Sequence, residues 1–394
     1  PAPLAALNVI AKTYTAPINK GLKIEAHAFA KLAVGDISKN LIDLYYINEA
    51  LKKESFVASS VKPQSIKAVA TVGAGIMGGG IAWLFSNIDL PVRIKDISWQ
   101  AIAVGYKQIN KIYAQLQKIR KYDRRQVNIK TNRVTSTTDY SGFGNVDLVV
   151  EAVVEDIKIK KTVFKEAEKH LKDDTIIASN TSGLSINEMA KAFKKPQRFV
   201  CMHFFNPVNR MPLVEIIPSN KTNPKPIATI VDIAKKTGKT PIVVKDCPGF
   251  LVNRILLPFM NEAMYLLAET GDVEKIDKIA KEFGMPMGPV TLADEVGIDV
   301  GYKVAKHLQE SYGERMLVCP LLEEVYGELS LLGKKSGKGF YIYNKGKKTL
   351  NSSIATLKLQ KNSLTNQEII DRLILIMLNE AAKWLEEKIV NKVE

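Results

Sequence analysis

The stretch Val72-Gly73-Ala74-Gly75-Ile76-Met77-Gly78 decides the fold. An apolar run from position 66 comes before it, and a run of helical character follows it as far as Phe85. A strand, a G-x-G-x-x-G turn and a helix in this order predict the corner of a dinucleotide-binding unit. Gly73 permits the sharp turn, Gly75 the approach of a pyrophosphate, and Gly78 the packing of the helix on the sheet. An ordinary tight turn can carry the same glycines, so the following sequence decides between the two.

A second apolar strand, Pro91 to Asp96, follows the predicted helix and ends in an acid. Asp96 stands at the spacing where a carboxylate binds a ribose 2′-hydroxyl, and an acid there favours NAD over NADP. Arg93 and Lys95 are the contrary observation, because a nearby cation could accept a 2′-phosphate. The two strands together predict a nucleotide site for NAD.

The bulk properties are those of a globular protein of several domains. The chain has 394 residues, 46% of them hydrophobic and 25% charged, which predicts two or three domains. The net charge of +15 comes from lysines spread over the whole chain, so no nucleic-acid partner is expected. A basic rim would instead attract a polyanionic substrate such as a coenzyme A thioester.

Neither a membrane segment nor a metal site is expected. The sequence contains no apolar run of membrane-spanning length and no signal peptide, so we expect a cytoplasmic protein without an integral membrane segment. The three cysteines, Cys201, Cys247 and Cys319, have neither a disulfide nor a zinc spacing.

The order of apolar runs predicts an α/β fold, a Rossmann-type doubly wound and mostly parallel sheet followed by an all-helical C-terminal domain. After Asp96 we expect a long polar helix and then a basic, flexible stretch around residues 120–125. Further strands are expected at residues 146–155, 175–178, 198–202, 213–217 and 241–244. The predicted domains are a helical tail with its linker at 1–62, the nucleotide domain at 63–246, the helical domain at 247–345, and a linker with a further helical segment at 346–394.

One internal similarity relates two helical segments. Residues 252–263 align with residues 370–381. Further along the same alignment, Leu267 corresponds to Leu385 and Glu269 corresponds to Glu387. Chance agreement between amphipathic helices is the alternative. We interpret the similarity as a duplicated helical module whose second copy starts near Leu364 and is cut off at the end of the chain.

One of the four histidines is placed for chemistry. His203 ends an apolar strand, where open α/β sheets bind ligands, whereas His170 and His307 lie in charged helices and His27 in the helical tail. Glu215 lies in the apolar strand Leu213 to Ile217, and a buried acid needs a partner. A His-Glu pair would orient the imidazole and stabilise its protonated form. The polar turn Asn180-Thr181-Ser182 ends a strand on the same side of the sheet.

Together these residues resemble a known family. The motifs run in the order of the L-3-hydroxyacyl-CoA dehydrogenases of fatty-acid β-oxidation, and they are Gly73-x-Gly75-x-x-Gly78, Glu151-Ala152-x-x-Glu155, Ser179-Asn180-Thr181-Ser182, His203-Phe204-Phe205-Asn206-Pro207, Asp246-Cys247-Pro248-Gly249-Phe250-x-x-Asn253-Arg254, Met287-Gly288-Pro289 and Gly337-Lys338-Gly339-Phe340-Tyr341. The first 53 residues resemble the end of the enoyl-CoA hydratase half of the bacterial multifunctional fatty-acid oxidation complex alpha subunit. The resemblance implies a dehydrogenase part with the tail of a hydratase half and a truncated second C-terminal module.

The resemblance also implies roles for particular residues. His203 would be the general base for the 3-hydroxyl group, oriented by Glu215, while Ser182 and Asn253 complete the catalytic set and, with Asn206, contact the substrate. The implied contacts to NAD are Gly73, Gly75, Ile76, Met77, Gly78, Asp96, Ala152, Val153, Glu155, Lys160, Asn180 and Lys335. Asp371 stands where the first copy has Asn253, which predicts a structural role for the second copy.

The implied reaction is the reversible, NAD-dependent oxidation of an L-3-hydroxyacyl-CoA to the 3-ketoacyl-CoA. Implied partners are the acyl-CoA substrate and a thiolase beta subunit in the full-length complex. Because the truncated second module would leave apolar surface of the first one uncovered, self-association is also expected. Two alternatives stay open at this point: a dehydrogenase for another β-hydroxy acid, and a scaffold that binds nucleotide without turnover.

Overall fold

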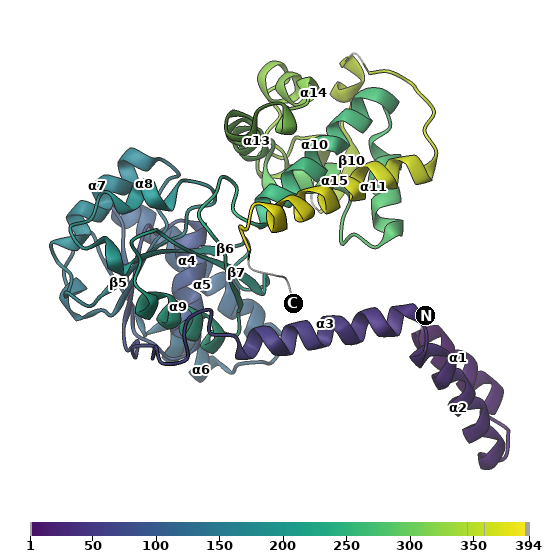
Figure 1. Cartoon of the computed structure of the whole chain (residues 1–394), viewed down its shortest axis with the longest axis horizontal. Coiled ribbons are helices and arrows are strands. Elements are labelled where there is room, and N and C mark those ends of the chain that lie inside the picture. The colour runs from purple at the N-terminus through teal and green to yellow at the C-terminus, as the bar shows by residue number, and fades with distance from the viewer. Residues whose placement is uncertain (1, 345, 358, 391–394) are drawn as a thin grey trace. The chain divides into compact units, whose positions relative to one another are not determined.

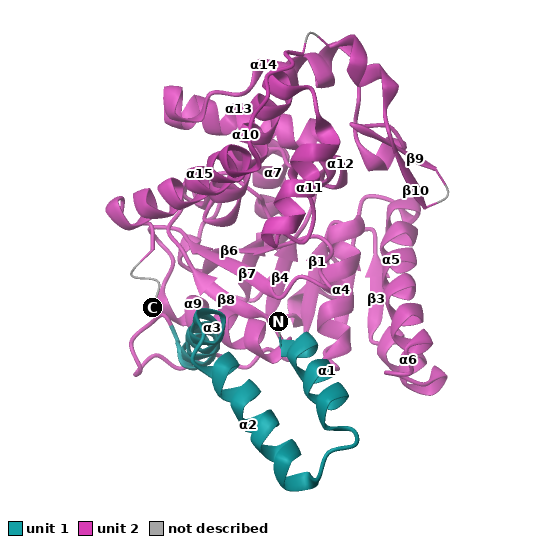
Figure 2. Cartoon of the chain, turned by 90° about the vertical axis from the view of Figure 1, so that its right-hand side faces the viewer, with its two compact units in different colours: residues 1–55, 394 teal, residues 56–393 magenta. Residues whose placement is uncertain are grey.

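A computed structural model describes residues 2–344, 346–357 and 359–390. The chain divides into two compact units, and the division in the sequence falls between Ser55 and Phe56 (Figure 2). The predicted boundary at residue 345 and the last four residues of the predicted second module lie outside the described residues. No helix in the described ranges is long and apolar enough to cross a membrane.

The first unit consists of three helices, α1 (Ala2–Thr13), α2 (Ile18–Ala33) and α3 (Asp36–Lys53). All three helices lie in the part of the chain where the sequence predicts a helical tail. None of the three helices has a buried residue among those described, and large apolar side chains such as Leu7 and Phe29 are more than 60% exposed. This unit therefore has no core of its own.

The second unit opens with the predicted sheet. Its eight strands lie in the order β3-β2-β1-β4-β5-β6-β7-β8, and all neighbours are parallel except β6 and β7. Their bounds are β1 Val69–Val72, β2 Val92–Lys95, β3 Val134–Thr137, β4 Leu148–Glu151, β5 Ile176–Ser179, β6 Phe199–Phe204, β7 Leu213–Pro218 and β8 Thr240–Val243. The strand order reverses between β1 and β4, the switch point at which doubly wound sheets bind nucleotides.

Helices cover both faces of this sheet (Figure 1). They are α4 (Ile76–Asn87), α5 (Trp99–Lys118), α6 (Arg124–Thr131), α7 (Ile157–Glu168), α8 (Ile186–Ala190) and α9 (Pro224–Lys236). The expectation of a flexible stretch at residues 120–125 is wrong at its end, because α6 begins at Arg124. Asp123 caps this helix with a reciprocal capping box to Gln126, which fixes its start.

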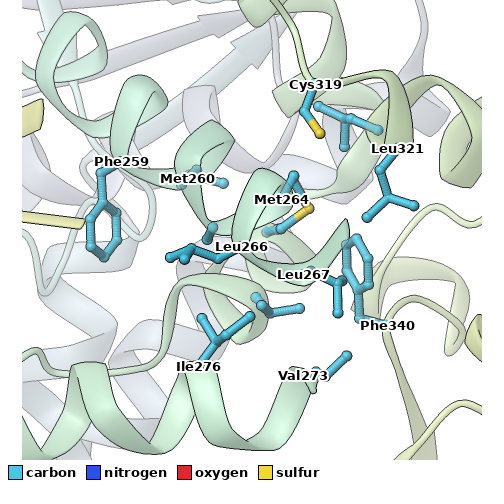
Figure 3. Packing of buried hydrophobic residues seen from close by; sticks show 14 of the residues in the cluster. Phe259, Met260, Met264, Leu266, Leu267, Val273, Ile276, Cys319, Leu321 and Phe340 are labelled. Carbon is cyan, nitrogen blue, oxygen red and sulfur yellow. The ribbon is translucent and has the colours of Figure 1, made fainter. Parts of the chain in front are cut away.

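The C-terminal domain is helical, as predicted, apart from a short antiparallel ribbon of β9 (Tyr341–Asn344) and β10 (Lys347–Leu350). Its helices are α10 (Val252–Thr270), α11 (Val273–Phe283), α12 (Pro289–Val296), α13 (Ile298–Tyr312), α14 (Pro320–Glu323) and α15 (Asn366–Glu386). Short segments of 3-10 or π-helix also occur in both domains, at Phe143–Asn145, Pro196–Arg198, Gly313–Met316, Glu324–Glu328, Lys334–Ser336 and Ser352–Thr356. One apolar core joins these helices, with Met264, Leu267 and Phe340 near its centre (Figure 3).

Two motifs of the helical domain have structural roles. The carboxylate of Asp277 accepts from the amide of Val290 at the start of α12, and that of Asp294 accepts from the amides of Phe340 and Tyr341. A Cβ atom at Gly288 would overlap Asp277, and one at Gly339 would overlap Asp294. These glycines let buried carboxylates reach backbone amides, so residues 287–289 and 337–341 stabilise the domain.

Candidate active site

The glycine turn has one closed side and one open side. Gly73 has φ +98°, and a Cβ atom there would overlap the backbone carbonyl of Ala152 behind the turn. A Cβ atom at Gly78 would overlap the carbonyl oxygen of Gly73, whereas one at Gly75 would meet nothing within 4 Å. Gly75 is the N-cap of α4 and has no side chain to accept from the amides of the first turn. The open side of the turn therefore offers helix amides to an anion such as a pyrophosphate.

Asp96 lies beside this turn, as the sequence predicted. Its Oδ2 accepts from the amide of Ala74 at 2.6 Å, which holds the carboxylate at the edge of the nucleotide site. The two cations on β2 have other partners: Arg93 Nε donates to the Ser141 carbonyl at 3.1 Å, and the buried Lys95 ammonium lies 4.7 Å from the centre of the Tyr140 ring. The arrangement suits the ribose hydroxyls of NAD.

A buried ion pair stands at the end of β4. Lys160 Nζ lies 2.7 Å from Glu151 Oε1 and 3.3 Å from Glu155 Oε2, and the side chains of Lys160 and Glu151 are each 1% exposed. Glu151 also accepts from Ser179 Oγ at 2.6 Å and from the Val153 amide at 2.7 Å. Glu151 was not among the predicted site residues. The signal for it was a carboxylate at the end of the apolar run 148–150.

Glu155 connects this pair to the polar turn after β5. Its Oε1 accepts from Thr181 Oγ1 at 2.6 Å and from the amide and hydroxyl of Ser182 at 2.7 and 3.0 Å. Burial alone would raise the pKa of this carboxyl group, yet the Lys160 ammonium and these hydrogen bonds outweigh burial, and the pKa is lowered. Glu155 is therefore an anion that orients Ser182.

The structure brings His203 and Glu215 together. The two residues are direct partners in the antiparallel pairing of β6 and β7, and His203 Nδ1 lies 2.6 Å from Glu215 Oε2. The His203 side chain is 6% exposed and the Glu215 side chain is fully buried. Because the carboxylate accepts a hydrogen from Nδ1, Nε2 of the neutral ring carries the free lone pair.

The other oxygen of Glu215 binds the start of the helical domain. Oε1 accepts from the amides of Leu251 and Val252, each at 2.9 Å, at the N-terminus of α10. Asn253 in the same turn donates from Nδ2 to the Ser182 carbonyl at 2.9 Å. Asn180 Oδ1 accepts from the Phe204 amide at 2.9 Å and so connects the ends of β5 and β6. All four predicted catalytic residues therefore belong to one hydrogen-bonded network with Glu155.

The remaining predicted site residues differ in their placement. Ile76 is exposed, Met77, Ala152 and Val153 are half-buried at the glycine turn, and Asn206 is exposed after β6. Lys335 lies in the helical domain, where its ammonium pairs with Asp299 at 2.5 Å. Lys160 does not face outward, because its ammonium is held between the two carboxylates.

The cysteines give a prediction that tests the packing around the site. Burial raises the pKa of the Cys201 thiol, and burial raises the pKa of both Cys247 and Cys319 to about 11. The thiolate is the reactive form, so in the native protein at neutral pH all three are expected to react slowly with a chromogenic disulfide reagent. After unfolding in guanidinium chloride all three should react at once. A thiol of the native protein that reacts as fast as in the unfolded chain would contradict this packing.

Two family descriptions match the chain. Residues 68–247 match the 3-hydroxyacyl-CoA dehydrogenase NAD binding domain, in agreement with the cofactor predicted from Asp96. Residues 249–343 match the 3-hydroxyacyl-CoA dehydrogenase C-terminal domain. The two matches cover both the sheet and the first helices after it.

Individual relatives extend this match. The fatty acid oxidation complex subunit alpha of Acinetobacter baumannii (strain SDF) is 40% identical over 402 residues, which cover 99% of this chain and 56% of that protein. The chain thus spans about half the length of the curated relatives it matches. The structure of (S)-3-hydroxybutyryl-CoA dehydrogenase PaaH1 from Ralstonia eutropha is 36% identical with a TM-score of 0.67, and the match covers 71% of this chain and 100% of the other.

A longer structural match includes part of the flanking sequence. The dehydrogenase part of multifunctional enzyme 1 from C. elegans is 27% identical with a TM-score of 0.62, covering 88% of this chain and 83% of the other. The family descriptions, the sequence relatives and the solved structures agree with the family that the motifs resemble. The chain belongs to the 3-hydroxyacyl-CoA dehydrogenase family.

Proposed function

We propose that the chain catalyses the reversible oxidation of an L-3-hydroxyacyl-CoA to the 3-ketoacyl-CoA with NAD. The observation that carries the proposal is the His203-Glu215 pair at the end of β6, on a sheet whose glycine turn and Asp96 suit NAD. A free Nε2 lone pair on an imidazole held by a buried carboxylate is what a base for an alcohol proton requires.

In this proposal each residue of the network has one task. His203 Nε2 takes the proton of the 3-hydroxyl group while the C3 hydrogen leaves with its electron pair. Glu215 keeps the ring in the tautomer with hydrogen on Nδ1 and stabilises the imidazolium that forms. Ser182 and Asn253 bind the substrate oxygen near the ring, and Asn206 contacts the acyl-CoA. NAD, when bound, supplies the hydride acceptor.

The proposed contacts to NAD follow the geometry of the turn. Gly73, Gly75, Ile76, Met77 and Gly78 offer backbone to the pyrophosphate, and Asp96 binds the ribose. The exit of β4 and the turn after β5 would line the nicotinamide end with Ala152, Val153, Glu155 and Asn180. Lys160 acts on this region through Glu155, with which its ammonium forms an ion pair. Lys335 stays a prediction, because its ammonium has Asp299 as its partner.

The setting of the enzyme is also a proposal. The relatives are named as alpha subunits of a fatty acid oxidation complex, so we infer that this chain works in fatty-acid β-oxidation as one part of a multifunctional protein. The domain limits 1–62, 63–246, 247–345 and 346–394, a thiolase subunit as partner, self-association and a cytoplasmic location remain predictions from the sequence.

Substrate comparison tests the proposed substrate class. Initial rates of NADH formation should be measured with L-3-hydroxybutyryl-CoA, a long-chain L-3-hydroxyacyl-CoA and free L-3-hydroxybutyrate. We expect kcat/KM for the thioesters to exceed that for the free acid by about 100-fold or more, because binding of the coenzyme A part positions the reacting carbon. Equal values for thioester and free acid would overturn the substrate assignment and favour a dehydrogenase for another β-hydroxy acid.

A further inference from the structure

Helices α10 and α15 are joined by two reciprocal sets of ion pairs. Arg254 on α10 lies near Glu380 of α15 and near Glu387, the C-cap residue of that helix, with Nε 3.4 Å from Glu380 Oε2 and Nη2 2.7 Å from Glu387 Oε2. Arg372 on α15 pairs with two glutamates of α10, at 2.6 Å with Glu262 and at 2.7 Å with Glu269.

These partners are equivalent positions of the internal repeat. In the alignment of residues 252–263 with 370–381, Arg254 corresponds to Arg372 and Glu262 to Glu380, and Glu269 likewise corresponds to Glu387. Each arginine near the start of one helix thus pairs with the glutamates toward the end of the other, as in an interface with two-fold symmetry. The two helices lie antiparallel along one another (Figure 1).

The surroundings of the two arginines are not equivalent. The Arg254 side chain is fully buried and Glu380 is 4% exposed, whereas Arg372 is 32% exposed. The guanidinium of Arg254 also lies 4.7 Å from the centre of the Tyr312 ring, and Tyr312 donates from its hydroxyl to the Pro248 carbonyl. A buried cation depends strongly on its anionic partners, since an unpaired charge away from water is costly.

Only Arg254 stands next to the candidate active site. It belongs to the first turn of α10, whose amides at Leu251 and Val252 hold Glu215 and whose Asn253 binds the Ser182 carbonyl. The chain beyond α15 returns to the same region, where the Lys245 amide donates to the Ile389 carbonyl at 3.2 Å. The start of α10 is thus fixed between the glutamates of α15 and the carboxylate that holds His203.

We propose that Glu380 of α15 and Glu387, the residue directly after that helix, are positioning residues for the dehydrogenase reaction, because they hold Arg254 and with it the turn of α10 that fixes Glu215 and His203. The proposal rests on the proposed function. It assigns to the segment after residue 364 a role in catalysis, although that segment contributes no residue to the predicted catalytic set.

The repeat offers a matched control for the test. Glu387 and Glu269 are equivalent positions, their side chains are 37% and 34% exposed, and each lies 2.7 Å from an arginine of the other helix. Glu387 differs in one respect, because it also lies 2.8 Å from Nη1 of Arg315. Both variants, Glu387→Gln and Glu269→Gln, should lower the thermal unfolding midpoint. We expect Glu387→Gln alone to lower kcat for L-3-hydroxybutyryl-CoA, by about 10-fold to 100-fold, because a small displacement of the base is sufficient for a loss of this size.

Two further measurements separate positioning from a loss of stability. The Kd of NADH, measured by fluorescence titration, should stay at the wild-type value in both variants, so that the effect falls on kcat. The pair Arg254→Lys and Arg372→Lys asks the same question without removing a charge, and it replaces the first pair if Glu387→Gln does not fold. Equal kcat in the two members of the folded pair, with an active wild-type enzyme, would overturn the positioning role alone. A wild-type chain without turnover would overturn the proposed function instead.

Discussion

Replacing His203 by glutamine is expected to lower kcat for L-3-hydroxybutyryl-CoA by about 1,000-fold, within the range that general-base catalysis supplies. Glutamine cannot accept and release a proton, so the 3-hydroxyl proton has no acceptor in the network around Glu215. His203 lies in β6, whereas the glycine turn lies between β1 and α4, so the substitution does not alter that turn. Steady-state kinetics should therefore show the loss in turnover, and NADH titration should show a Kd near the wild-type value.

The matched control for this variant is His170→Gln. His170 is exposed and stacks on the Tyr140 ring at 5.0 Å, far along the chain from the His203-Glu215 pair. Its replacement should leave kcat and KM unchanged. Near-normal turnover in His203→Gln would remove His203 from the reaction, whatever the outcome for His170.

The second large effect is expected from Gly78→Ala. A Cβ atom at position 78 would overlap the carbonyl oxygen of Gly73, and both groups belong to backbone that cannot easily shift. We expect a loss of about 3 kcal/mol in the free energy of unfolding, as for other overpacked sites, and a large loss of NADH binding. Urea unfolding and fluorescence titration with NADH measure the two effects.

Gly75→Ala serves as the contrasting variant. A Cβ atom there meets no other atom within 4 Å, so the folded chain should keep its stability. NADH binding should still weaken, because the methyl group would stand where the pyrophosphate approaches the backbone. A Gly78→Ala protein as stable as the wild type would contradict the packing of α4 on the turn.

The fold could be predicted where the sequence has continuous apolar runs or a defined turn motif. Buried strands such as β1 and β4 are continuous apolar runs, and the turn between β1 and α4 has a defined glycine pattern. Strand β3 was not predicted because Val134-Thr135-Ser136-Thr137 lies at the edge of the sheet and is only partly buried. An edge strand needs fewer apolar residues, so its signal in the sequence is weak.

The sequence allowed residues of the candidate site to be selected, but it did not determine which of them are hydrogen-bonded to one another. His203 and Glu215 could be selected because polar residues in apolar strands need partners. Their pairing depends on the antiparallel turn between β6 and β7, which strand periodicity does not determine. The ion pairs of Lys160 and Lys335 could not be predicted for the same reason. Their partners, Glu151 and Asp299, are brought close only by the packing of the folded chain.

One measurement tests the central claim most directly: the appearance of NADH when the purified chain is mixed with NAD and either L- or D-3-hydroxybutyryl-CoA, with the acyl product identified. We predict that the L isomer gives acetoacetyl-CoA in equal amount to NADH and that His203→Gln suppresses this formation. No NADH from the L isomer, or equal rates from both isomers, would contradict the proposal that this network is an L-3-hydroxyacyl-CoA dehydrogenase site.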